Sequence, residues 1–79
     1  MNKDEIMKKL QIIIREAVND DEVEINANTV ASDIEGWDSL AQIVIMGELQ
    51  NELNVKFTSS EINGFANIGE LVDAIKMKL

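Results

Sequence analysis

The sequence of 79 residues contains no cysteine, histidine, tyrosine or proline, and only one tryptophan. Without cysteine the chain can form neither a disulfide nor a thiolate metal site, so its hydrophobic core alone must stabilise the fold. The absence of histidine and tyrosine leaves carboxylates, lysines and hydroxyls as the candidates for an acid, a base or a nucleophile. Autonomous catalysis is therefore not expected, and we predict that the protein is not an enzyme.

Basic residues are also scarce, because 7 Lys and Arg face 15 Asp and Glu, which gives a net charge of −8. This sign disfavours nucleic acid and anionic membrane surfaces as partners and favours basic protein surfaces. The acidic residues within 20–24 lack the ligand spacing of an EF-hand loop. We therefore expect no nucleic-acid partner and no metal site.

Long apolar runs are missing as well. A signal peptide or a membrane span needs a continuous apolar stretch, whereas the first twenty residues mix charged with apolar side chains. We therefore expect a cytoplasmic protein without membrane insertion. Hydrophobic residues make up 46% and charged residues 28%, the balance of a globular protein, and the length suits one small domain, residues 1–79, which we expect to be monomeric.

Apolar residues recur at helical spacing through most of the chain. The pattern predicts two long helices, a short one and a closing one, at residues 2–19, 39–53, 58–64 and 67–79. No run of residues is typical of a strand. We therefore predict an all-α fold, a four-helix bundle with a long loop between helices 1 and 2 and a short helix 3.

Capping-box patterns and loop anchors add detail to this prediction. Residues 20–38 form the long loop, with Val30 and Ile34 as its expected contacts with the core. Trp37 is expected to anchor the end of this loop. Three helix starts carry the pattern of a capping box, at Asn2–Glu5, Thr58–Glu61 and Asn67–Glu70.

The predicted helix 39–53 is apolar on two sides. Its expected core face consists of Ile45, Met46, Leu49 and Leu53. A second stripe consists of Leu40, Ile43, Val44 and Gly47. An exposed stripe of this kind would mark a docking surface or the mouth of a pocket, whereas a helix buried on all sides would place it in the core. The sequence alone leaves both interpretations open.

Ser39 stands at the start of this helix, inside the stretch "GWDSL". In one interpretation Ser39 is the N-cap and forms a capping box with Gln42. In the other, Asp38 is the N-cap and Ser39 presents a free hydroxyl in the first turn. The helix N-terminus would then favour a phosphate on that hydroxyl.

Asp38-Ser39-Leu40, after a long acidic loop, resembles the phosphopantetheine attachment motif of acyl carrier proteins. Asp33-Ile34 and residues 67–75 are similar to further stretches of that family, and the resemblance covers essentially the whole chain. It implies a bundle of acyl-carrier-protein type in which a phosphopantetheinyl transferase adds 4′-phosphopantetheine from coenzyme A to Ser39. Acyl groups would be carried as thioesters on this phosphopantetheine arm, which supplies the thiol that the chain lacks. Partners would be acyl-transferring or acyl-activating enzymes.

The resemblance also implies further site residues. The residues that match or adjoin the family's acyl pocket are Val30, Ile45, Leu49, Phe65, Leu71 and Val72. Those expected to dock partner enzymes are Leu40, Ile43, Val44, Gly47, Glu48 and Ile62. The family's acidic side chains on the second helix are partly replaced here, for example by Ala41 and Gln50, which suggests partners that bind a more apolar surface.

Three functions fit these observations. The first is a stand-alone acyl carrier protein of a specialised fatty-acid, polyketide or related pathway. The second is a carrier of aminoacyl or D-alanyl groups, although the aspartate before Ser39 favours acyl carriers. The third, a noncovalent helical interaction module, would need no modified serine.

Overall fold

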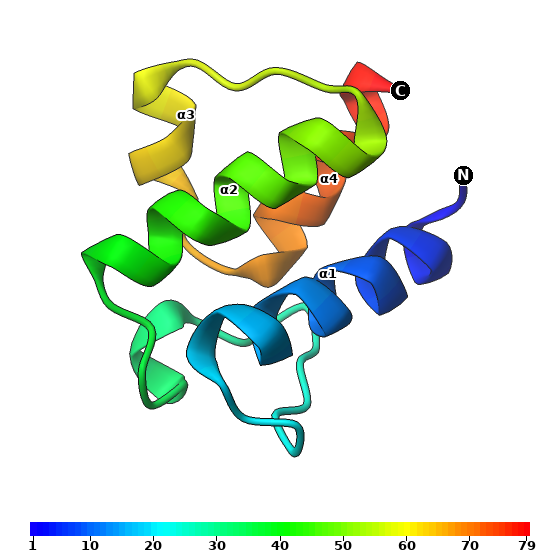
Figure 1. Ribbon diagram of the computed structural model, residues 1–79. Helices are drawn as coiled ribbons and strands as arrows, with labels where there is room; N and C mark the ends of the chain where they lie inside the picture. Colours follow the sequence, from blue (N-terminus) through cyan, green and yellow to red (C-terminus); the bar gives the residue numbers. More distant parts are fainter.

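A computed structural model describes all residues, 1–79, and contains four α-helices and no strand. The helices are α1 (Lys3–Val18), α2 (Ser39–Leu53), α3 (Ser59–Gly64) and α4 (Ile68–Lys78). The structure confirms the all-α fold with a long α1–α2 loop and a short third helix (Figure 1). None of these helices has the length and apolar character required to cross a membrane.

The helix ends follow local capping chemistry. The predicted capping boxes at the starts of α1 and α3 are both present. At the start of α4 the Asn67 side chain accepts from the Glu70 N–H, but the Glu70 carboxylate accepts from the Ala66 N–H and not from that of Asn67. Asn19 and Asn54 adopt the left-handed conformation and end α1 and α2, because a short polar side chain tolerates that conformation better than most.

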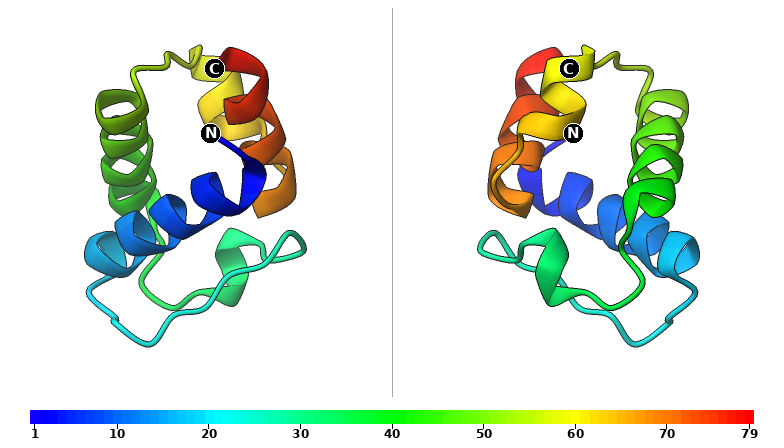
Figure 2. Two further views of the ribbon diagram at one scale, coloured as in Figure 1. Left: turned by 90° about the vertical axis from the view of Figure 1, so that its right-hand side faces the viewer. Right: turned by 90° about the vertical axis from the view of Figure 1, so that its left-hand side faces the viewer.

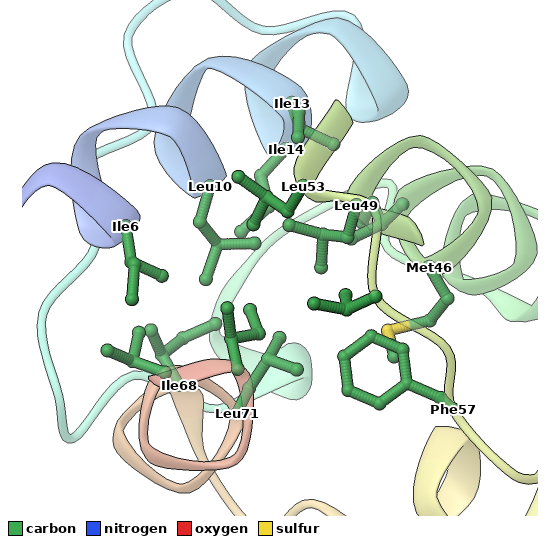
Figure 3. Packing of buried hydrophobic residues seen from close by; sticks show 14 of the residues in the cluster. Ile6, Leu10, Ile13, Ile14, Met46, Leu49, Leu53, Phe57, Ile68 and Leu71 are labelled. Atoms are coloured by element: carbon green, nitrogen blue, oxygen red, sulfur yellow. The ribbon is translucent and has the colours of Figure 1, made fainter. Parts of the chain in front are cut away.

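α1 is the central packing element, because it contacts both α2 and α4 (Figures 1 and 2). Apolar side chains from α1, α2 and α4 point into the space between these helices and fill it (Figure 3). The most completely buried of them are Ile6, Leu10, Ile14, Ile45, Met46, Leu49 and Ile75. The predicted core face of α2 is therefore confirmed.

The α1–α2 loop is held to α1 by side chains of that helix. The Gln11 side chain accepts from the Ile25 N–H at 2.9 Å, and Arg15 Nε donates to the Val23 carbonyl at 2.6 Å. A 3₁₀ turn, Ala31–Asp33, follows within the loop. Of the two predicted loop anchors, Ile34 is buried in the core and Val30 is half-buried.

The loop also caps α4, a contact that the sequence did not suggest. The carbonyls of Thr29 and Ala27 accept from the N–H groups of Ile68 and Gly69, each at 2.9 Å. A Cβ atom at Gly69 would lie only 3.0 Å from the Ala27 carbonyl oxygen, so this close approach favours glycine. The contact fixes the loop, and hence the residues that lead into α2, relative to the start of α4.

α3 is fastened at its start by a charged contact. Lys78 lies 2.9 Å from the Glu61 carboxylate and 5.3 Å from the centre of the Phe57 ring. The hydrogen bond from the Thr58 amide, together with Lys78, lowers the pKa of Glu61 below its ordinary value. Both contacts favour the ionised carboxylate, so their stabilisation is present above pH 4.5 and is lost as the pH falls through the lowered pKa.

Candidate cofactor-attachment site

Asp38 is the N-cap of α2. Its carboxylate accepts from the Ala41 N–H at 2.8 Å, and its backbone is extended, as a cap requires. Ser39 is consequently the first residue of the helix and its side chain is exposed. The alternative in which Ser39 caps the helix and pairs with Gln42 is wrong. The Gln42 N–H donates to the Asp38 carbonyl, and the Gln42 side chain bonds Trp37 and the Ile62 carbonyl.

The backbone around Ser39 suits an anionic substituent. The Gln42 N–H donates to the Asp38 carbonyl at 3.0 Å, which leaves the N–H groups of Ser39 and Leu40 without an intrahelical partner. These groups, at the positive end of a helix of 15 residues, favour a phosphate bound to the nearby hydroxyl. The exposed hydroxyl at this helix start therefore fits a phosphate-linked group.

The hydroxyl has no group beside it that would activate it for attack. The chain contains no histidine, and the Asp38 carboxylate is engaged in capping. A base for chemistry at the Ser39 hydroxyl is therefore not found among these residues.

Asp38→Ala is expected to lower the free energy of unfolding by roughly 0.5–2 kcal/mol, because the Ala41 amide loses its cap. Asp38→Asn should retain most of the stability, since asparagine caps about as well as aspartate. Ser39→Ala should cost little. Urea unfolding of the three unmodified variants compares these losses, and an equal loss in Ser39→Ala would show that the serine also caps the helix.

The residues before the site form a tight, anchored turn. Gly36 has a φ of +89°, a backbone conformation that residues other than glycine rarely adopt. Trp37 packs against the hydrophobic core, and its indole Nε1 donates to Gln42 Oε1 at 2.7 Å. The prediction of Trp37 as a loop anchor is confirmed.

The second apolar stripe of α2 lies on the surface. Leu40, Ile43 and Val44 are 70%, 66% and 44% exposed, so the interpretation of α2 as buried on all sides is wrong. Gly47 and Glu48 are also exposed, while Ile62 of α3 is half-buried. We refer to Leu40, Ile43, Val44 and Gly47 as the outer face of α2.

The predicted pocket residues lie in two different surroundings. Phe65 and Leu71 line a cavity of about 50 Å³ between the α1–α2 loop, α2 and the start of α4. The others do not line it: Ile45, Leu49 and Val72 lie in the core, and Val30 is half-buried. Contact of any of the six with an acyl chain stays a prediction.

Gln42 is a residue of the site that the sequence analysis missed. Its Nε2 donates to the Ile62 carbonyl at 2.7 Å, in addition to the bond that its Oε1 accepts from Trp37. The only sequence signal was the capping pattern with Ser39, which indicated a different role. Because Ile62 lies twenty residues further along the chain, no local pattern could have indicated this contact.

Known proteins are similar to this chain in sequence and in fold. The family described as "Phosphopantetheine attachment site" matches residues 8–75. An acyl carrier protein of Thermotoga maritima is 27% identical over 78 residues, which cover 99% of this chain and 96% of the relative. The solution NMR structure of the holo acyl carrier protein from Geobacter metallireducens matches with a TM-score of 0.82 and 30% identity, over 91% of this chain and 83% of that one.

The helical fold, with an exposed serine at the start of α2, is that of a phosphopantetheine-binding carrier domain. The chain belongs to the acyl carrier protein family, and its prosthetic group is 4′-phosphopantetheine. Members of this family are carriers and not catalysts, and they interact with acyl-handling enzymes.

Proposed function

We propose that Ser39 is the attachment residue and that the chain, as one domain, is a stand-alone acyl carrier protein. The observation that carries the proposal is the exposed Ser39 hydroxyl at the first position of α2, beside two free backbone amides. A phosphopantetheinyl transferase would remove the hydroxyl proton while the serine oxygen attacks the phosphorus atom of coenzyme A that is bonded to the pantetheine. The new oxygen–phosphorus bond replaces the bond between that phosphorus and the bridging oxygen of the diphosphate, and the nucleotide leaves as adenosine bisphosphate.

The residues of the chain indicate which chemical groups it provides and which must come from the cofactor or from partner enzymes. Bound phosphopantetheine supplies the thiol that this cysteine-free chain lacks. The chain itself holds the arm at the start of α2 and presents it, while partner enzymes supply the acid and base groups. We therefore propose that the chain is not itself an enzyme and that it acts as a monomer.

The outer face of α2 is the proposed docking surface for those partners. A partner must reach the arm at Ser39, and the outer face begins at the next residue, Leu40, and continues along the same helix. Its apolar character, with Glu48 as its acidic neighbour, supports partners that bind through apolar contacts. Partners of this kind support a role of the protein in a specialised fatty-acid, polyketide or related pathway.

Val44→Glu is expected to impair acyl transfer to or from the partner while changing the free energy of unfolding by less than about 0.5 kcal/mol, because the side chain is exposed. Ile12→Glu is the matched control. Ile12 is 56% exposed on α1 and lies outside the outer face, so this variant should transfer normally.

Thermal melts of the unmodified variants come first. A severe loss of stability in Val44→Glu would mean that the carboxylate is forced into the core, and would contradict the docking surface. Equal transfer by wild type and Val44→Glu would contradict it as well.

Two other functions are separated by mass spectrometry. A noncovalent interaction module would remain unmodified after incubation with coenzyme A and a broad-specificity transferase. An aminoacyl or D-alanyl carrier would be modified in the same way, but a cognate activating enzyme would then add an aminoacyl group and not a fatty-acyl or polyketide group. Intact mass after each step distinguishes the three.

A further inference from the structure

Two hollows meet beside the start of α2. One is the small interior cavity that Phe65 and Leu71 line. The other is an open groove that starts at Ser39 and runs between α2 and α3. Trp37 and Gln42 line both hollows, together with Ala31. These side chains therefore separate the groove at the attachment residue from the interior.

A chain of hydrogen bonds holds the side chains at this boundary in place. Trp37 Nε1 donates to Gln42 Oε1, and Gln42 Nε2 donates to the Ile62 carbonyl, each at 2.7 Å. α3 has six residues and ends at Gly64, so the Ile62 carbonyl has no partner within its own helix. The Ala66 N–H, which would follow in a longer helix, binds Glu70 instead. Gln42 thus satisfies a carbonyl that α3 itself leaves free.

The cavity behind these side chains has little room for a ligand. A cavity of about 50 Å³ is far smaller than the roughly 150 Å³ of a cavity that takes up benzene. An acyl chain of several carbons could enter from the groove only if the side chains shared by the two hollows, Trp37 and Gln42, moved apart. That movement breaks the bond between Trp37 and Gln42, and displacement of the Gln42 side chain also breaks its bond to the Ile62 carbonyl.

We propose that the hydrogen-bonded pair Trp37–Gln42 is a partition that sets the shortest acyl chain admitted to the interior. This inference rests on the proposed attachment at Ser39. A chain carried there lies first in the groove, against Gln42. It enters the interior only when the apolar surface that it buries outweighs the hydrogen bonds that are broken, and both effects are small for a single group. Short chains therefore stay in the groove and longer ones open the partition.

The test is the melting temperature of the protein loaded with acetyl, butyryl, hexanoyl or octanoyl phosphopantetheine from the corresponding coenzyme A thioesters. Each loaded form is compared with the phosphopantetheine form of the same variant. In wild type the acetyl and butyryl forms should show no rise, and a rise should begin only with longer chains. In Gln42→Ala the rise should already begin with butyryl and reach roughly 4–8 °C.

Gln50→Ala is the matched control. Gln50 is also a glutamine of α2 that bonds a backbone group, the Phe57 N–H at 3.0 Å, but it lines neither hollow. This variant should keep the chain-length threshold of wild type. Trp37→Phe retains an aromatic ring but loses the N–H, so it should lower the threshold as Gln42→Ala does, and it provides a second test should Gln42→Ala fold poorly.

Tryptophan fluorescence gives an independent readout, because Trp37 is the single tryptophan. In wild type its emission should change only with chains at or above the threshold, and in Gln42→Ala already with butyryl. The same threshold in wild type, Gln42→Ala and Trp37→Phe would overturn the partition. Intact mass of every sample separates this failure from that of the proposed function, since a chain that cannot be loaded at Ser39 would contradict the attachment itself.

Discussion

Ser39→Ala is expected to abolish the transfer of phosphopantetheine from coenzyme A, while the wild-type chain should gain one such group. The reason is that the serine oxygen is the proposed bond-forming atom, and alanine has no hydroxyl to replace it. The measurement is the intact mass of each protein after incubation with a broad-specificity transferase. The fold should be nearly unchanged, because Asp38 and not Ser39 caps α2.

Ser59→Ala is the matched control for this experiment. Ser59 is likewise an exposed first residue of a helix, directly after a capping side chain, but it opens the short α3. This variant should be modified as completely as wild type. Modification of Ser39→Ala to the wild-type extent would show that another residue accepts the group.

Leu49→Ala should destabilise the protein by about 2–5 kcal/mol, because a fully buried leucine leaves a cavity when it is truncated. Such a loss lowers the melting temperature of a domain of this size by at least about 8 °C. Thermal and urea unfolding of the unmodified variant measure the loss.

Leu40→Ala supplies the comparison on the same helix. Leu40 is 70% exposed, so its truncation should change the free energy of unfolding by no more than about 0.5 kcal/mol. A similarly small effect of Leu49→Ala would mean that Leu49 faces a space that can collapse or open, as a pocket residue would, and not the packed core.

The helices could be predicted from the sequence because their signals are local. In α1 the apolar side chains recur on one face, and the side chain of Asn2 bonds the backbone only three residues away. The same holds for Thr58 at the start of α3. Interactions of such short range leave their pattern in neighbouring residues, which is why the helix limits were found to within about one residue.

The attachment site could be predicted only in part. Aspartate and serine are both good N-caps, so the sequence alone could not decide between Asp38 and Ser39. The resemblance to acyl carrier proteins favoured Ser39 as the modified residue, but only the three-dimensional structure assigns the cap to Asp38.

Contacts between distant segments account for what the sequence could not show. The bond from Gln42 to Ile62 joins two helices, and the bonds from Ile68 and Gly69 reach back to the α1–α2 loop. None of these partners is marked by spacing or composition. The outer face of α2 was visible as a stripe, yet its exposure depended on where the other helices packed.

The most direct test of the central claim is to locate the modification by fragmenting the phosphopantetheine-loaded wild-type protein in a mass spectrometer. The chain has four serines, at positions 32, 39, 59 and 60, and the account predicts that fragment ions place the added mass on Ser39. Added mass on Ser32, Ser59 or Ser60, or no added mass at all, would contradict the assignment of Ser39 as the attachment residue.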